Sequence, residues 1–200
     1  MSFRIEEKIS INNFNVFEFK KWLFSKGAKT LYPQRIINSI YFDNKLRMYS
    51  DSNEGIVPRK KIRIRTYDTE DFFSSKKSFK KETKITYYNY RFKEVEKFIL
   101  NKQNFLTGIH DQFYGQCQPN LNVFYKRNYF FVFNTRFTLD EDIEYRKLNN
   151  GILSNFSIKD KSFVVEIKSN KIHNTDYFKD ILPLPRSRFS KYCRGIELVN

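Results

Sequence analysis

Polar and apolar residues alternate over several segments of this chain, and a period of two is typical of a β-strand with two different faces. In Arg59–Tyr67, for example, the basic residues Arg63 and Arg65 share one face while Ile62 and Ile64 share the other. The alternation predicts strands at Phe3–Ile11, Ile36–Asp43, Arg59–Tyr67, Ser78–Thr86, Leu121–Phe133, Thr135–Asp140 and Phe163–Lys168. Aromatic residues favour strands, and the chain has 22 Phe and 13 Tyr in 200 residues.

Other segments have apolar residues at helical spacing or a capping residue at their start. We predict helices at Asn13–Lys26 with Gly27 as its stop, from Asp43 or Asn44 through Tyr49, at Arg91–Asn101 and at Thr175–Leu182. No internal repeat, linker or low-complexity block divides the sequence. We therefore predict a single domain over residues 1–200.

The net charge of +15 favours an anionic partner, such as nucleic acid, a membrane surface or a phosphorylated small molecule. Basic residues recur at alternate strand positions, usually with a Glu nearby, as in Glu82 and Lys84 or Glu166 and Lys168. Two interpretations are open. The basic faces form a solvated surface, or the sheet closes into a barrel that holds them in its lumen. Like charges in a low-dielectric lumen repel strongly, so a closed barrel would need a polyanion or bound counter-ions.

The two cysteines, Cys117 and Cys193, are far apart and match no metal or redox spacing. We expect reduced thiols in a cytoplasmic protein. The charged N-terminus is unlike a signal peptide, and the longest strongly apolar run, Tyr129–Phe133, is too short to span a bilayer. A position at the inner face of a membrane, through a partner protein that the sequence does not identify, stays open.

Eight short motifs follow one another along nearly the whole chain. They are Arg4–Lys8 (RIEEK), Ser39–Asp43 (SIYFD), Lys61–Tyr67 (KIRIRTY), Lys81–Lys84 (KETK), Asn122–Arg127 (NVFYKR), Arg136–Asp140 (RFTLD), Val165–Lys168 (VEIK) and Ser190–Tyr192 (SKY). In this order they resemble the VTC domain, the polyphosphate polymerase branch of the CYTH and triphosphate tunnel metalloenzyme superfamily. The resemblance implies an α+β fold in which an eight-stranded antiparallel β-barrel forms a tunnel flanked by helices.

The resemblance also implies a role for each matched residue. The cations that hold the phosphates are Lys8, Arg63, Arg65, Lys84, Arg127 and Arg136. Further substrate contacts come from Lys168, Ser190 and Lys191. Glu166, together with Glu6, would bind the metal, Mn²⁺ or Mg²⁺, through oxygen ligands. We expect Asp140 to anchor a nearby cation or a turn, while Glu82 is open between an ion pair with a neighbouring Arg and a metal role.

The activity that the resemblance implies is a metal-dependent phosphotransferase. A polyphosphate polymerase would transfer the γ-phosphoryl of ATP, or of another nucleoside triphosphate, to a growing polyphosphate chain. Arg4 stands where the wider superfamily has the first Glu of Glu-x-Glu-x-Lys, which favours the polymerase branch over the small tripolyphosphatases. The alternatives are a triphosphatase, in which Glu6 or Glu82 orients water, and a non-catalytic binder of polyphosphate or nucleic acid. The sequence has no RNA-binding motif of the usual kinds, so no nucleic-acid partner is expected, and the oligomeric state stays open.

Overall fold

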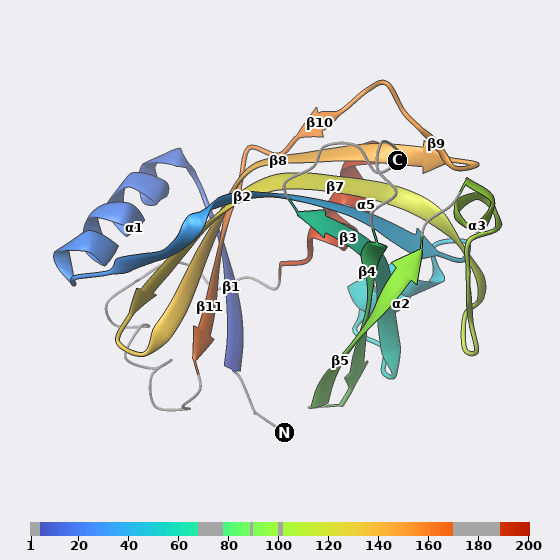
Figure 1. Cartoon of the computed structure of the whole chain (residues 1–200), viewed down its shortest axis with the longest axis horizontal. Coiled ribbons are helices and arrows are strands. Elements are labelled where there is room, and N and C mark those ends of the chain that lie inside the picture. The colour runs from blue at the N-terminus through green and yellow to red at the C-terminus, as the bar shows by residue number, and fades with distance from the viewer. Residues whose placement is uncertain (1–4, 68–77, 89, 100–101, 170–188) are drawn as a thin grey trace. The chain divides into compact units, whose positions relative to one another are not determined.

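The computed structural model describes residues 5–67, 78–88, 90–99, 102–169 and 189–200. Its elements are β1 (Ile5–Ile11), α1 (Asn13–Ser25), β2 (Lys29–Asp43), α2 (Arg47–Glu54), β3 (Arg59–Tyr67), β4 (Ser78–Tyr87), β5 (Tyr90–Ile99), α3 (Lys102–Thr107), β6 (Ile109–Asp111), β7 (Gly115–Val132), β8 (Thr135–Asn149), β9 (Ile152–Leu153), β10 (Ile158–Lys159), β11 (Phe163–Ser169) and α5 (Lys191–Val199) (Figure 1). Each of the seven predicted strands corresponds to a strand of the structure, although Phe3 and Arg4 lie outside the described residues.

Eight strands form the main hydrogen-bonded order, which is β1-β11-β8-β7-β2-β3-β4-β5. The short strands β6, β9 and β10 pair to the sides of this order. The ladders β1–β11, β11–β8, β2–β3, β3–β4 and β4–β5 are all antiparallel. In the described part of the chain β1 and β5 stand at the two ends of the order. The predicted α+β class, with eight strands, antiparallel ladders and accompanying helices, is confirmed.

The chain folds into two compact units that interleave along the sequence. Unit 1 comprises Met1–Arg35, Tyr125–Ile143 and Lys159–Phe189, and unit 2 comprises Ile36–Phe124, Glu144–Ile158 and Ser190–Asn200. The long strands β2, β7 and β8 each contribute residues to both units. The single domain predicted from the sequence stays a prediction.

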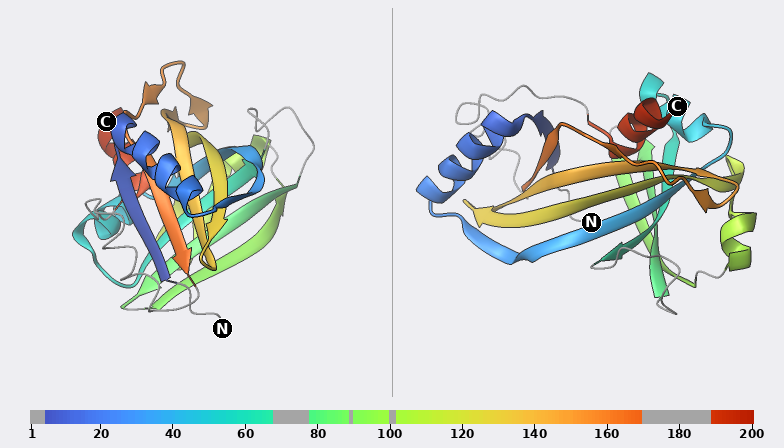
Figure 2. Two further views of the ribbon diagram at one scale, coloured as in Figure 1. Left: turned by 90° about the vertical axis from the view of Figure 1, so that its left-hand side faces the viewer. Right: turned by 90° about the horizontal axis from the view of Figure 1, so that it is seen from above.

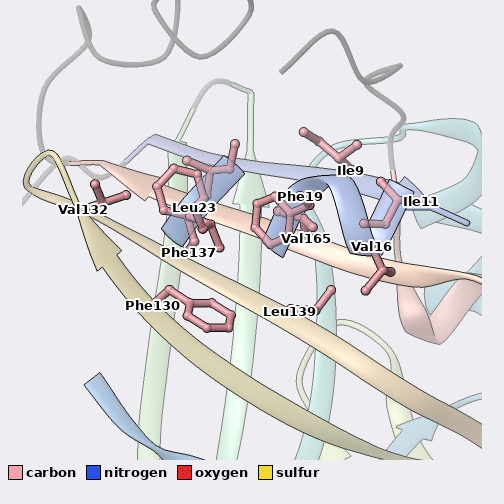
Figure 3. Close-up of a cluster of buried hydrophobic side chains, with 11 residues drawn as sticks. Ile9, Ile11, Val16, Phe19, Leu23, Phe130, Val132, Phe137, Leu139 and Val165 are labelled. Atoms are coloured by element: carbon pink, nitrogen blue, oxygen red, sulfur yellow. The ribbon is translucent and has the colours of Figure 1, made fainter. Parts of the chain in front are cut away.

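Helix α1 covers one face of the strands of unit 1 (Figure 2). The Asn12 side chain caps it by accepting a hydrogen bond from the backbone N–H of Asn15 at 3.0 Å, so the cap lies one residue before the predicted Asn13. The helix buries Val16, Phe19 and Leu23. These pack against strand residues of the same core, namely Ile9, Ile11, Phe130, Val132, Phe137, Leu139, Val165 and Ile167 (Figure 3). Because strand side chains alternate, the residues between these core positions lie on the opposite face.

Unit 2 contains the β2–β3–β4–β5 ladders and the short helix α2. The buried Asp43 at the end of β2 holds the start of α2, since its carboxylate accepts hydrogen bonds from the backbone N–H of Met48 at 2.9 Å and of Tyr49 at 3.0 Å. The helix begins at Arg47, with Leu46 as its N-cap, and runs to Glu54, so Asp43 stabilises its first turn without being the N-cap residue that was predicted. Behind the ladder, Phe42 meets Phe105 edge to face with ring centroids 6.4 Å apart.

The helix predicted at Arg91–Asn101 is wrong, because this segment forms strand β5, which pairs with β4 from Ser78↔Ile99 to Tyr87↔Tyr90. Its apolar residues Phe92, Val95, Phe98 and Ile99 have helical spacing, and in the strand they fall on both faces. Backbone pairing with the edge of β4 stabilises the extended conformation of this segment. The helix predicted at Thr175–Leu182 lies outside the described residues. Both cysteines are buried free thiols, as expected, and burial raises the pKa of Cys117 to about 12.

Candidate functional site

In unit 1, the sheet face opposite α1 carries the charged residues that the sequence analysis assigned to phosphate and metal binding. Strand register places Glu6 opposite Lys168 and Lys8 opposite Glu166 across β1 and β11. Across β11 and β8 it places Lys168 opposite Arg136 and Glu166 opposite Thr138. We call this set the unit 1 cluster, and it consists of Glu6, Lys8, Arg127, Arg136, Asp140, Glu166 and Lys168.

Lys168 links the two carboxylates that the sequence assigned to a metal. Its Nζ lies 2.5 Å from Oε1 of Glu6 and 3.1 Å from Oε1 of Glu166. The other oxygen of Glu166, Oε2, lies 3.4 Å from Nη2 of Arg127. Glu166 is thus buried between two cations, and its charge is compensated without a metal.

Arg127 has its closest partner in Asp140. The Asp140 carboxylate accepts hydrogen bonds from Nε at 2.5 Å and from Nη2 at 2.7 Å, which is the bidentate geometry of a strong Arg–carboxylate pair. Burial would lower the pKa of Arg127, but the charge and hydrogen bonds of Asp140, with smaller contributions from Tyr125 and Glu166, raise the pKa well above its usual value. The expectation that Asp140 anchors a cation is confirmed. The edge of the Arg127 guanidinium formed by Nε and Nη2 is consequently occupied by Asp140.

Two polar atoms of the unit 1 cluster face are buried without a hydrogen-bond partner among the described residues. They are Nε of Arg136 and the hydroxyl oxygen of Thr138. A buried polar atom without a partner is costly, and such atoms are rare in folded proteins. They lie at adjacent positions of one face of β8, where a bound anion or water could satisfy them.

Unit 2 has a basic face on the β3–β4–β5 ladders. By register and alternation, this face carries Arg59, Lys61, Arg63, Arg65, Lys80, Lys84, Arg91, Lys93 and Lys97. Lys61, Lys84 and Lys93 stand in one row across the three strands, although like charges directly opposite each other destabilise a sheet. Among the described residues of these strands, Glu82 is the one acidic residue on this face.

Glu82 gathers three of these cations around one buried carboxylate. Its Oε2 accepts hydrogen bonds from Nε of Arg63 at 2.7 Å and from Nη2 of the same residue, and it lies 3.8 Å from Nη1 of Arg65. Its Oε1 accepts a hydrogen bond from Nζ of Lys93 at 2.5 Å. Burial would raise the pKa of Glu82, but these positive charges outweigh burial and hold the pKa well below its usual range. The sequence left Glu82 open between an ion pair with a neighbouring Arg and a metal role, and in the structure Glu82 forms the ion pair.

Tyr41 contacts the guanidinium of Arg63 on the side away from Glu82, and the charges of the basic face act on its hydroxyl group. Its hydroxyl oxygen accepts a hydrogen bond from Nη1 of Arg63 at 2.8 Å, and its ring stacks on that of Tyr192 with centroids 5.0 Å apart. Burial would raise the pKa of Tyr41, yet the charges of Arg63 and Arg65 outweigh it and lower the pKa. Tyr41, opposite Arg63 in the β2–β3 register, is therefore part of the basic face of unit 2.

The start of α5 joins the basic face through Lys61. Ser190 caps α5 by accepting a hydrogen bond from the backbone N–H of Cys193 at 3.3 Å. The same hydroxyl lies 2.8 Å from Nζ of Lys61, whose pKa is lowered chiefly by burial. Lys191 is the first residue of the helix. The sequence motif SKY therefore marks a capped helix start beside a half-buried lysine.

The predicted site residues fall into two groups, according to the unit that holds them. Lys8, Arg127, Arg136, Glu166, Lys168 and Glu6 belong to unit 1, and Arg63, Arg65, Lys84, Ser190 and Lys191 belong to unit 2. Prediction from sequence missed Lys93, because the segment that carries it was assigned to a helix. It also missed Lys61, although this residue shares the alternating face with Arg63 and hence carried a usable signal.

The two carboxylates of unit 1 supply part of a metal site. Among the described residues, no group of three or more His, Cys, Asp or Glu side chains is placed to hold a metal. Glu6 and Glu166 are nevertheless within hydrogen-bond distance of one ammonium group, that of Lys168. Mg²⁺ is commonly bound by one or two carboxylates, with substrate phosphates and water completing its shell. These two carboxylates are donors of the kind that such an ion takes together with a phosphorylated substrate, and in this structure both contact the Lys168 ammonium instead.

Comparison with protein families settles the relationship of the chain. The family model described as the VTC domain matches residues 3–200. The chain belongs to the VTC domain family. No curated protein sequence matches it.

Solved structures support the fold of this VTC domain. A candidate adenylate cyclase from Vibrio parahaemolyticus matches with a TM-score of 0.53 and 13% identity, covering 98% of each chain. A candidate adenylyl cyclase from Hippeastrum, described as having a dominant triphosphatase activity, matches with a TM-score of 0.53 and 10% identity. That match covers 99% of the VTC domain chain and 97% of the other. At these identities the similarity shows the fold alone, and it confirms the predicted triphosphate-tunnel fold.

No helix in the described part of the VTC domain has the length and apolar character needed to cross a membrane.

Proposed function

We propose that this VTC domain is a polyphosphate polymerase that transfers the γ-phosphoryl group of ATP, or of another nucleoside triphosphate, to the end of a polyphosphate chain. The observation that carries the proposal is the basic face of unit 2. Nine basic residues share that face with Glu82 as its one acid in the described strands. Such a concentration of like charge is destabilising by itself and is offset when a polyanion binds.

The roles proposed for the residues follow from their surroundings. In unit 2, Arg63 and Arg65 bind phosphate oxygens through their guanidinium groups, which suit paired hydrogen bonds. Lys84, Lys191 and the hydroxyl of Ser190 add further contacts. In unit 1, Arg136 has a buried Nε without a partner among the described residues, which a phosphate oxygen would satisfy. The remaining phosphate contacts of unit 1 are assigned to Lys8, Arg127 and Lys168.

The reaction needs little covalent help from the protein. A terminal oxygen of the acceptor attacks the γ-phosphorus, the bond from that phosphorus to the oxygen bridging the β- and γ-phosphates breaks, and the electron pair leaves with ADP. Catalysis consists of placing the two phosphate ends in line and neutralising the charge on the transferring group. Fixed cations on rigid strands perform both tasks, because they do not reorganise during the reaction.

Glu6 and Glu166 are the residues that we propose for the divalent ion, Mn²⁺ or Mg²⁺. When bound, such an ion neutralises charge on phosphate oxygens. The contribution of the protein is the pair of carboxylates, which Lys168 holds side by side. Arg127 keeps Glu166 oriented from the opposite side.

A triphosphatase is the second candidate, and the description of the Hippeastrum neighbour favours it. The same cations would then hold the triphosphate while water replaces the phosphate acceptor. The ion pairs of Glu82 with Arg63 and Lys93 argue against that carboxylate as the base that orients the water. Glu6 is then the remaining candidate for this role.

The product distinguishes the two functions. Purified protein is incubated with ATP and Mn²⁺, and the products are resolved on a polyacrylamide gel stained for polyphosphate. A ladder of long chains with release of ADP is expected, and it should disappear in Arg63→Ala. Orthophosphate without chains would instead assign the protein to the triphosphatases, and the lack of either product would contradict both proposals.

A further inference from the structure

We propose that Glu82 is an internal counter-ion that occupies the place of a phosphate oxygen among Arg63, Arg65 and Lys93, and that it lowers the affinity of this VTC domain for phosphate chains. The inference deepens the proposed function and rests on it, because it assigns to Glu82 the control of affinity at the same basic face. Glu82 is a positioning residue here, since it acts through the cations and not on the reacting atoms.

The contacts of Glu82 are those expected of a bound phosphate group. One oxygen is shared between Nε and Nη2 of Arg63 and lies 3.8 Å from Nη1 of Arg65, while the other accepts a hydrogen bond from Lys93. Guanidinium groups bind carboxylate and phosphate oxygens with the same paired geometry. A phosphate oxygen that approaches Arg63 along this edge therefore competes with Glu82.

The surroundings make Glu82 a permanent competitor. Its side chain is only 3% exposed and its carboxylate stays ionised, because the nearby cations hold its pKa well below the usual range. The Glu82 carboxylate therefore does not become neutral by protonation near neutral pH. The groups that face it are Arg63 and Arg65 from β3 and Lys93 from β5, with Lys80 and Lys84 two positions away on its own strand.

Glu82 affects the protein both without and with bound substrate. Without substrate, Glu82 offsets the repulsion among the cations and keeps the guanidinium groups oriented. With substrate, its negative charge opposes the phosphates and weakens binding. A long polyanion held by many cations would otherwise dissociate very slowly, so a fixed negative charge favours movement and release of the chain.

The test is the binding of inorganic triphosphate by isothermal titration calorimetry, at one fixed salt concentration and without nucleotide. Glu82→Gln keeps the size of the side chain, removes its charge and leaves one acceptor oxygen in place of two. We expect the variant to bind triphosphate at least about tenfold more tightly than the unmodified protein, because unit charges a few ångströms apart interact strongly at a partly buried site. We also expect a lower melting temperature without ligand and a larger increase when triphosphate is added.

Glu96→Gln is the matched control. Glu96 lies on the neighbouring strand of the same ladder but on the opposite face, where it pairs with Lys81 at 2.8 Å and has a side chain that is 62% exposed. Its removal changes the net charge of the protein by the same amount. Triphosphate affinity should therefore change by less than about twofold, since an exposed charge at that distance is screened.

Equal or weaker binding of triphosphate by Glu82→Gln would overturn the inference, because a purely structural Glu82 predicts weaker binding. If circular dichroism shows that this variant does not fold, Glu82→Asp decides. Its shorter side chain cannot reach all the cations at once, and binding about two- to threefold tighter is expected. A protein that binds no triphosphate in its unmodified form would contradict the proposed function itself, whereas tight binding without a gain in the Glu82 variants contradicts only the role of Glu82.

Discussion

Asp140 and Arg127 form a buried bidentate ion pair between neighbouring strands of unit 1. The two hydrogen bonds measure 2.5 and 2.7 Å, and the Asp140 side chain has no solvent exposure. The pair holds the guanidinium that in turn contacts Glu166. The position of the proposed metal carboxylate consequently depends on an acid that itself has no proposed contact with substrate.

Replacement of Asp140 by Asn should destabilise the protein strongly. The change leaves the Arg127 charge buried with one of its partners neutral, and loss of a partner from such a pair typically costs about 3–5 kcal/mol. Urea denaturation followed by circular dichroism measures the change in unfolding free energy. Asp142→Asn is the control, because Asp142 pairs with Lys126 at the surface and should contribute less than about 1 kcal/mol. Equal losses of unfolding free energy in Asp140→Asn and Asp142→Asn would show that the Asp140–Arg127 pair stabilises the protein no more than a surface pair.

Arg63→Ala and Arg136→Ala should each reduce turnover by at least about a hundredfold while the fold is retained. Each change removes a fixed cation proposed to hold the transferring phosphates. The rate of ADP release measures turnover, and circular dichroism checks the fold. Lys81→Ala, on the opposite face of the β3–β4 ladder, should leave the rate within about twofold. Full activity of Arg63→Ala would contradict the proposed site.

Glu166→Gln should abolish the stimulation of activity by Mn²⁺ and weaken Mn²⁺ binding in the presence of triphosphate by at least about tenfold. The amide has one oxygen and no charge, so it is a poor ligand for a hard cation. Electron paramagnetic resonance of free Mn²⁺ measures the binding without reference to activity. Glu7→Gln is the control, since Glu7 lies on the same strand as Glu6 but faces the other way. Unchanged Mn²⁺ binding in Glu166→Gln would place the metal elsewhere.

Tyr41→Phe should change the dependence of stability on alkaline pH. The pKa of Tyr41 is lower in the folded protein than its usual value of 10.0, because Arg63 and Arg65 outweigh the effect of burial. Between the folded pKa and the unfolded one, the unfolded chain binds more protons, so Tyr41 adds stability as pH rises through this window. The difference in unfolding free energy between the unmodified protein and Tyr41→Phe should thus grow toward about pH 10. A constant difference would show that the phenol keeps its ordinary pKa.

Several features of the fold could be predicted from the sequence because they depend on local pattern. Strand β3 was predicted with its bounds, since four basic residues occupy alternate positions along it, with Ile62 and Ile64 between the last three. Helix α1 was predicted to within one residue of its cap because an Asn and a Gly bracket a helical apolar stripe. Strand β5 could not be predicted, since its apolar residues have the spacing of a helix and pairing with the edge of β4 overrides that local pattern.

The candidate site divides in the same way. Alternation determined which cations share a face, as in Arg63 and Arg65, and motif order indicated the family. The sequence could not determine which acid meets which base, because the pairs depend on strand register and some join residues far apart in the chain, as Lys168 with Glu6 and Arg127 with Glu166 do. It also gave no sign that Tyr41 contacts Arg63, since that contact depends on the β2–β3 register.

The sequence by itself determined that this protein has antiparallel strands with one strongly basic face, because side-chain alternation is a property of the extended backbone. Only the tertiary structure decided that Glu82 compensates three of the cations and that Lys168 holds two carboxylates together. Those decisions require the strand register, and register is set by the packing of entire strands against one another rather than by any short segment of sequence.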